Sequence, residues 1–236
     1  MKFEANIFFE ALFSSAYLKG AGISIALATL CQALAIVLGF FLTLMRVSSN
    51  PILSRISGAY IWFFRAIPAL LLLMICWFSI PEVFPPFRHH WYSPFMAAAL
   101  GFAVLEAAYM AEILRASLMS VDEGQALAGR ALGMTPSQVM RKVTLPQLIR
   151  IAIPPTANEY IGMIKYTSLA TVISLQELLT TAGNGVNKTF RYSEYYAAAG
   201  VYYLVMVSIL MIVQAKFERK FAWISISRKD SAKAKR

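Results

Sequence analysis

Charged residues are scarce in this sequence. Asp, Glu, Lys and Arg make up 14% of its 236 residues, whereas soluble domains carry about a quarter. Hydrophobic residues make up 58%. This balance excludes an ordinary soluble domain and predicts a membrane protein. The length suits one membrane domain of a few helices, with no room for a separate catalytic domain.

Cysteine and histidine are also rare. Cys31 and Cys76 both stand inside apolar runs, so they cannot form the framework of a disulfide-stapled fold. His89 and His90 are neighbours in a predicted loop, a spacing more typical of a surface than of a metal site. We therefore expect no metal and no cofactor. Acidic residues near the N-terminus also argue against a cleavable signal peptide.

Long apolar stretches dominate what is present. Each reaches the roughly 20 residues needed to cross a bilayer as a helix, and they cover residues 21–45, 56–80, 94–118, 154–180 and 195–215. The predicted fold is all-α, a polytopic membrane protein with five transmembrane helices. Residues 1–19 should form an N-terminal segment at the periplasmic face. It is either an amphipathic helix in the interface or a buried leading segment.

Basic residues are unevenly divided between the two sides of the membrane. Fifteen would lie on one side, eight of them in the tail that starts at Lys216, and five on the other. The side richer in Lys and Arg is normally cytoplasmic. The C-terminus, with a basic tail over residues 221–236, is therefore predicted in the cytoplasm and the N-terminus outside.

Residues 121–146 form a charged island between the third and fourth apolar stretches. A segment this polar lies outside the bilayer, because backbone and polar groups cannot be satisfied in lipid. Ser120 and Glu123 have the spacing of a capping box and predict a helix over residues 122–132. Gly133 can take the left-handed conformation that ends such a helix.

A second short helix is predicted after this glycine. Thr135 offers its N-cap, Pro136 its first position and Gln138 the reciprocal capping partner. Pro146 should end it, because proline supplies no amide to continue the ladder. The island is thus a cytoplasmic helical pair.

Three roles fit such a pair. It could dock on a cytoplasmic partner, read DNA as a helix-turn-helix, or serve as a structural connector. The second helix offers only Arg141 and Lys142 as phosphate contacts. This is too few for the basic patch of a DNA reader, so no nucleic acid is expected.

The island resembles the EAA loop of permease subunits of ATP-binding-cassette importers, in particular the polar amino acid group. That pattern is E-A-A, three residues, Gly, nine residues, an aliphatic residue, one residue, then Leu-Pro. Here it falls on Leu127, Ala128, Gly129, Gly133, Val143, Leu145 and Pro146. Leu127 stands in place of the glutamate and Gly129 in place of the second alanine.

Three further segments resemble the same family in order along the chain. Residues 64–68 (FRAIP) resemble its F-R-G-T-P motif, and residues 108–115 resemble A-Y-x-A-E-I-x-R. Residues 165–169 (KYTSL) resemble K-D-T-S-L, with Tyr166 in place of aspartate, and residues 177–179 (ELL) follow. The permease domain would cover residues 20–220, with the loop at about 120–150.

The resemblance implies a transmembrane subunit of an ATP-driven importer of a polar amino acid or a derivative, working by alternating access in the bacterial inner membrane. It implies an ATPase dimer, an external solute-binding protein and a second permease subunit, either this chain or a paralogue. It also implies that the loop couples to the ATPase through Gly124, Leu127, Ala128, Leu132, Gly133, Leu145 and Pro146.

The chain itself should not be an enzyme. Gly124 and Gly129 have the spacing of a phosphate loop, but Arg130 and Ala131 follow where Lys and Ser or Thr are required. A stand-alone secondary carrier or channel is the alternative class of function. It has no need for a capped docking helix.

Ionisable residues within the apolar stretches are costly and therefore candidates for the transport pathway. Lys165 shares a polar stripe with Asn158 and Ser168, and could hold a substrate carboxylate or a helix-end carbonyl. Glu159 could bind an ammonium or form a structural pair, and Glu106 could line the pathway.

Two arginines within or near these stretches have other candidate roles. Glu112 and Arg115 are three residues apart and predict an ion pair at the interface. Arg65 could snorkel to the interface or act in gating.

Overall fold

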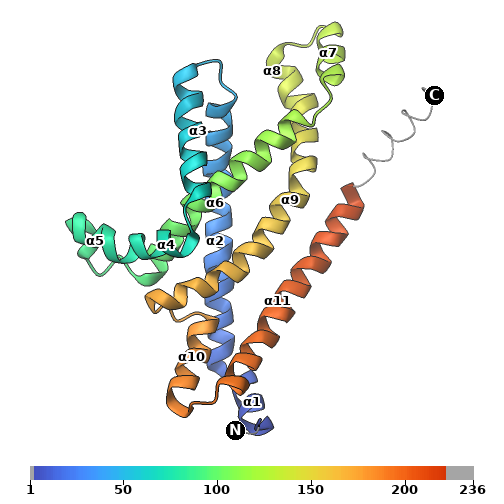
Figure 1. The fold of residues 1–236 in the computed structure, drawn as a ribbon. Coiled ribbons are helices and arrows are strands. Elements are labelled where there is room, and N and C mark those ends of the chain that lie inside the picture. Colours follow the sequence, from blue (N-terminus) through green and yellow to red (C-terminus); the bar gives the residue numbers. More distant parts are fainter. Residues whose placement is uncertain (1–2, 222–236) are drawn as a thin grey trace.

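The computed structural model describes residues 3–221, and these are helical with no strand among them (Figure 1). The α-helices are α1 (Ala5–Leu12), α2 (Ser15–Arg46), α3 (Pro51–Ala66), α4 (Ala69–Met74), α5 (Ile80–Val83), α6 (Pro94–Met119), α7 (Glu123–Ala131), α8 (Pro136–Val139), α9 (Leu145–Tyr166), α10 (Leu178–Thr189) and α11 (Tyr192–Phe221). The all-α class predicted from the sequence is confirmed. The predicted tail, residues 221–236, lies almost wholly outside the described residues.

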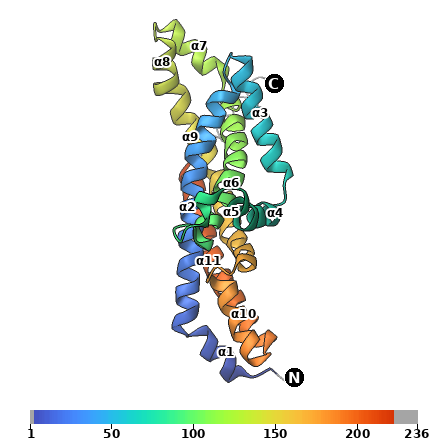
Figure 2. The same ribbon diagram turned by 90° about the vertical axis from the view of Figure 1, so that its left-hand side faces the viewer.

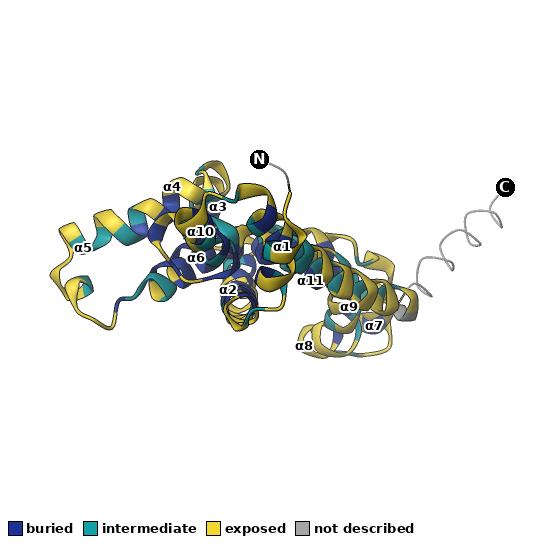
Figure 3. Ribbon diagram, turned by 90° about the horizontal axis from the view of Figure 1, so that it is seen from below, coloured by how far each residue is buried: buried dark blue, intermediate teal, exposed yellow. Residues whose placement is uncertain are grey.

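Three of the described helices, α2, α6 and α11, are long and apolar enough to cross a membrane. The bent pair formed by α3 and the segment 69–83 brings the number to four if it counts as one span. They contain the predicted first, third and fifth stretches; α6 agrees within one residue, whereas α2 starts six residues earlier than predicted and α11 extends beyond both predicted ends. Many large apolar side chains on α2 and α11 are exposed, as expected where a helix faces lipid (Figure 3).

The centre of the fold is the contact between α2 and α6, which share the largest interface. Small residues allow the two backbones to approach closely. A Cβ added to Gly39 would lie 2.6 Å from the Met110 Cβ and 3.0 Å from the Ala111 amide nitrogen. Nearby, the Thr43 hydroxyl donates to the Ala111 carbonyl at 3.0 Å. Close packing and interhelical hydrogen bonds of this kind are what join helices in a bilayer, where lipid competes with apolar contacts.

The second predicted stretch, 56–80, is not one straight helix. α3 ends at Ala66, and the chain turns by 100° before α4 starts at Ala69. Ile67 and Pro68 at this break have extended backbone angles. The cause is Pro68, because the residue before a proline is pushed out of the helical region. Figure 1 shows α4 and α5 leaving the long axis of the bundle.

The fourth predicted stretch, 154–180, is wrong at both ends. α9 starts nine residues earlier, at Leu145, and continues through Pro154 and Pro155 to Tyr166. A 3₁₀ segment (Thr167–Ile173) follows, then Ser174 with a φ of 59°, and α10 starts only at Leu178. Residues 167–177 are therefore a break between two helices.

α1 packs against α11 at the end of the molecule opposite to α7 and α8 (Figures 1 and 2). The Tyr202 hydroxyl donates to the Leu12 carbonyl at 2.8 Å. An ion pair also joins Arg191 to Glu4, whose amide donates to Glu194. The N-terminal segment is thus anchored to the bundle by α11.

Candidate functional site: the coupling hairpin and the polar residues of the bundle

The charged island folds as a helical hairpin, but its first cap is not the predicted one. Asp122 is the N-cap of α7, and its carboxylate accepts a hydrogen bond of 2.7 Å from the Gly124 amide. The Ser120 hydroxyl instead donates to the Ala116 carbonyl at 2.8 Å. The predicted capping box of Ser120 and Glu123 is therefore wrong. Ser120 is still part of the last turn of α6, so its side chain bonds backwards.

The turn and the second cap follow the prediction. Gly133 has a φ of +81°, the left-handed conformation that residues with a Cβ adopt at a cost. Thr135 and Gln138 form a reciprocal capping box. The Gln138 side chain accepts from the Thr135 amide at 2.9 Å, and the Thr135 hydroxyl accepts from the Gln138 amide at 3.3 Å. The two helices are thus held in a fixed relation.

The sequence predicted that Pro146 ends the second helix, and this prediction is wrong. After α8 the chain passes through a π-helical turn (Met140–Thr144) directly into α9, with Pro146 in the first turn. The Leu145 amide bonds to the Met140 carbonyl five residues back. A π turn shifts the hydrogen-bond ladder, and the first turn of a helix tolerates a proline because its amides need no helical partner. The hairpin is therefore continuous with a long helix of the bundle.

Gly129 is the buried residue where α7 meets α8. A Cβ there would lie 3.1 Å from the Val139 Cγ2 and 3.4 Å from the Met134 sulfur. This tight packing gives a physical reason for glycine where the resembling pattern has alanine. The sequence prediction did not assign Gly129 to the site.

The opposite face of the hairpin is exposed and apolar in part. Leu132 is 83% exposed and Leu127 62% exposed. Ala128, Gly124, Gly133 and Pro146 are exposed as well, and only Leu145 is half-buried. We call Gly124, Leu127, Ala128, Leu132 and Gly133 the hairpin surface.

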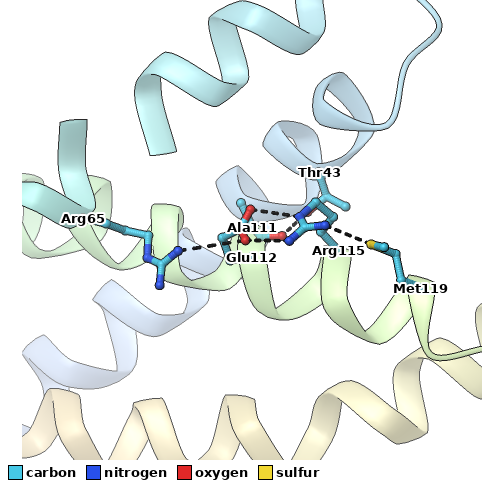
Figure 4. Close-up of polar contacts among 6 residues, drawn as sticks. All are labelled: Thr43, Arg65, Ala111, Glu112, Arg115 and Met119. Carbon is cyan, nitrogen blue, oxygen red and sulfur yellow. Dashed lines mark hydrogen bonds and ion pairs between the residues drawn. The ribbon is translucent and has the colours of Figure 1, made fainter. Parts of the chain in front are cut away.

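A charged cluster lies between the end of α3 and the last turns of α6 (Figure 4). Arg115 donates two hydrogen bonds to Glu112, from Nε at 3.0 Å and from Nη2 at 2.9 Å, which confirms the predicted pair. Arg65 is also part of this cluster. Its Nη1 lies 3.9 Å from Glu112 Oε2, and its guanidinium lies 5.5 Å from the centre of the Tyr109 ring. One carboxylate therefore joins two arginines from different helices.

Two of the predicted pathway residues lie near each other. Glu106 on α6 is 1% exposed, and its Oε1 has no hydrogen-bond partner among the described residues. Glu159 on α9 is half-buried and interacts electrostatically with both Glu106 and Arg65. The arrangement can accept a cation or a hydrogen-bond donor.

The remaining pathway candidates are exposed or bonded locally. Asn158 and Lys165 have exposed side chains on α9. The Ser168 hydroxyl donates to the Lys165 carbonyl at 2.7 Å. In this single chain the two glutamates therefore lie close enough to interact electrostatically, whereas Lys165 is exposed.

Glu177, which the sequence prediction noted only as part of a resembling motif, is a completely buried carboxylate. It caps α10 by accepting from the Thr180 amide at 2.7 Å. Ser24 on α2 and Tyr203 on α11 donate to its other oxygen at 3.3 Å and 3.1 Å. One side chain thereby ties three helices together.

Comparison with known proteins decides the family. Residues 35–223 match the family described as binding-protein-dependent transport system inner membrane component. The chain belongs to this family. A probable amino-acid permease protein, YxeN of Bacillus subtilis, is 38% identical over 197 residues, which cover 84% of this chain and 87% of that protein. The probable amino-acid ABC transporter permease protein PatM of Vibrio harveyi is 36% identical over 93% of this chain and 97% of its own length.

A solved structure shows the same arrangement. The crystal structure of an amino acid ABC transporter with histidines superposes with a TM-score of 0.85, at 29% identity, over 93% of this chain and all of that chain. The protein is therefore a permease subunit of an ABC importer. It lies in the inner membrane, and its ATPase is a separate subunit. The family also implies an external solute-binding protein. A stand-alone carrier is excluded by this membership.

Proposed function

We propose that this permease subunit admits a polar amino acid or an amino acid derivative and that the hairpin surface couples it to the ATPase. The substrate class is supported by the four motifs in the sequence and by the names of the relatives YxeN and PatM. A second permease subunit, the same chain or a paralogue, completes the pathway. Nucleic acid has no role.

The observation that carries this proposal is the exposed apolar face of a rigidly capped hairpin. Leu127 and Leu132 are large apolar side chains that are mostly exposed on the hairpin surface. Fully burying one leucine is worth about 1.5–3 kcal/mol, so these two side chains could anchor a partner. Two caps and the Gly133 turn keep the hairpin stiff, and the π turn links it to α9. A motion at the hairpin is then transmitted to the bundle.

The membrane topology follows from charge and from helix length. The domain over residues 20–220 crosses five times: once each by α2, by the bent α3–α4 segment, by α6, by α9 and by α11. The hairpin and the C-terminus lie in the cytoplasm, and the N-terminus lies outside, as the distribution of Lys and Arg favours. α9 is the most polar crossing because part of it faces a wet pathway.

Glu106 and Glu159 are proposed to hold the ammonium group of the substrate. Glu106 supports this because a buried carboxylate oxygen without a partner is costly and is stabilised by a cationic donor. Lys165, with Asn158 and Ser168 beside it, would hold the carboxylate. An exposed lysine at this depth needs a wet cavity or a partner helix.

Reconstituted vesicles test the proposal. The chain is combined with its ATPase and solute-binding protein, and uptake of labelled amino acids is measured with ATP and without it. We expect ATP-driven uptake that is lost in Leu132→Asp. A matched control is Val83→Asp, which changes a side chain that is 67% exposed on α5. Uptake that persists without the ATPase would overturn the coupling mechanism.

A further inference from the structure

A groove of about 430 Å³ runs between α9 and α11, with α2 behind it. Figure 1 shows α9 and α11 next to each other along this part of the bundle. Ten residues line the groove, and none carries a charge: Gln32, Ile153, Thr156, Ala157, Tyr160, Ile161, Leu210, Val213, Gln214 and Phe217.

The spacing of these residues shows that two helix faces meet at the groove. On α11, Leu210, Val213, Gln214 and Phe217 follow the i, i+3, i+4, i+7 pattern of a single face. On α9 the lining residues repeat in the same way from Ile153 onward. An apolar groove lined along two turns of each of two neighbouring helices can accommodate a hydrocarbon chain.

The side of α9 on which the groove lies argues against the substrate or the second permease subunit as the molecule that fills it. Asn158, Gly162 and Lys165 form the polar stripe of α9. At 3.6 residues per turn, the groove residues lie on nearly the opposite side of that helix. The groove therefore faces away from the proposed pathway. α11, which forms one wall, has only 17% of its apolar window buried.

Basic residues stand beside the groove, toward the end lined by Ile153 and Phe217. Arg150 lies one turn before Ile153 on α9, and Lys216 lies one turn after Val213 on α11, both exposed. Arg219 follows on α11. The acidic residue Glu218, also on α11, accepts a hydrogen bond from Gln214 at 2.9 Å. The end of the groove keeps a net positive charge, which attracts an anionic headgroup.

We propose that this groove binds an acyl chain of an anionic phospholipid, whose phosphate headgroup contacts Arg150 and Lys216. The proposal depends on the orientation given above only for the leaflet, which would be the cytoplasmic one. Bound lipid would fill the space between α9 and α11 and so hold α11 against the helix that carries the hairpin.

Photolabelling of the complete transporter tests this site. The transporter is placed in vesicles of phosphatidylcholine and phosphatidylglycerol that contain a trace of phosphatidylglycerol with a diazirine in its acyl chain. Labelled peptides are identified by mass spectrometry. We expect label on residues 153–161 and 210–217, and loss of it in Leu210→Trp, which fills the groove. Ile212→Trp is the control, because Ile212 is 57% exposed and faces away from the groove.

The headgroup is tested separately, in case the tryptophan disturbs folding. Lys216→Gln and Arg150→Gln should each lower labelling by roughly fivefold relative to a diazirine phosphatidylcholine probe. The proposal would be overturned if the label were spread evenly over the exposed faces of α2 and α11 and did not change in Leu210→Trp. The label would then report ordinary contact with bulk lipid. A disulfide between the cysteine of a Val213→Cys variant and a cysteine of a second permease chain would show that a protein fills the groove and would overturn the proposal. Neither result depends on transport, so the proposed function is tested independently.

Discussion

Arg65, the next-to-last residue of α3, lies 3.9 Å from the carboxylate of Glu112, which is seven residues before the end of α6. The same carboxylate binds Arg115, whose Nη1 donates to the Met119 sulfur at 2.9 Å (Figure 4). Met119 ends α6 just before the hairpin begins. A single glutamate thus connects the 100° bend of α3–α4 with the helix that leads into the coupling hairpin.

Glu112→Ala should destabilise the chain by about 1–2 kcal/mol. The substitution leaves two arginines without their partner. Because the site is partly exposed, the cost should lie between the costs of breaking an exposed ion pair and a buried one. Thermal unfolding in detergent should show a lower Tm by about 2–8 °C. Glu10→Gln, at an exposed glutamate, is the control and should leave Tm unchanged. An equal Tm in both variants would contradict the bridging role.

Gly133→Asp should uncouple ATP hydrolysis from uptake. A side chain at a φ of +81° costs about 1–2 kcal/mol and destabilises the turn of the hairpin. This corresponds to roughly a tenfold lower ratio of formed to unformed turn, and coupled uptake should fall with it. Gly133→Asn is the matched variant, because asparagine and aspartate both tolerate the left-handed region and differ in the negative charge that aspartate adds to the hairpin surface, so Gly133→Asn should retain more uptake. Normal uptake in Gly133→Asp at normal membrane levels would contradict a coupling role for this turn.

Glu106→Gln should impair transport without removing the protein from the membrane. Glutamine keeps the shape but not the charge, and a hydrogen bond to a charged group is worth about 1.5–3 kcal/mol. The rate of uptake at low substrate concentration should fall by roughly ten- to a hundredfold. ATPase activity without substrate should stay the same. Uptake at the wild-type rate would mean that the substrate ammonium binds elsewhere.

Glu177→Ala should destabilise the junction of α2, α10 and α11. The buried hydroxyls of Ser24 and Tyr203 and the Thr180 amide would lose their acceptor, at about 1–3 kcal/mol for a buried group left unsatisfied. Glu177→Gln keeps one oxygen for the cap and should lose less. Limited proteolysis of the two variants compares them, and equal resistance of Glu177→Ala and wild type would argue against the three-helix link.

The sequence predicts α6 within one residue at each end, because its stretch is predominantly apolar and long enough to cross a bilayer although Glu106 and Glu112 stand within it. The Thr135–Gln138 cap, the Gly133 turn and the Glu112–Arg115 pair were also predicted. All of these depend on residues within four positions of one another, so local chemistry is sufficient to specify them.

Errors occur where a proline or a tertiary contact decides between alternatives. Pro68 breaks a helix, Pro146 lies in the first turn of one, and Pro154 and Pro155 lie inside one. The sequence around these prolines is apolar or amphipathic in every case, so it does not distinguish the three outcomes. The sequence predicted Ser120 as the N-cap of α7, but Asp122 occupies that position. The Arg65–Glu112 contact joins residues 47 positions apart, and the cradle of Glu177 joins three helices, so neither leaves a local signal in the sequence.

Site-specific photocrosslinking tests the central claim, that the hairpin surface is where this permease meets its ATPase. A photoreactive amino acid replaces Leu132 in the assembled, ATP-active transporter, and a second sample carries it at Trp91, which is 48% exposed in the loop before α6. The account predicts crosslinks to the ATPase from position 132 and none from position 91. An active transporter with no ATPase crosslink from position 132, or with equal crosslinks from both positions, would contradict it.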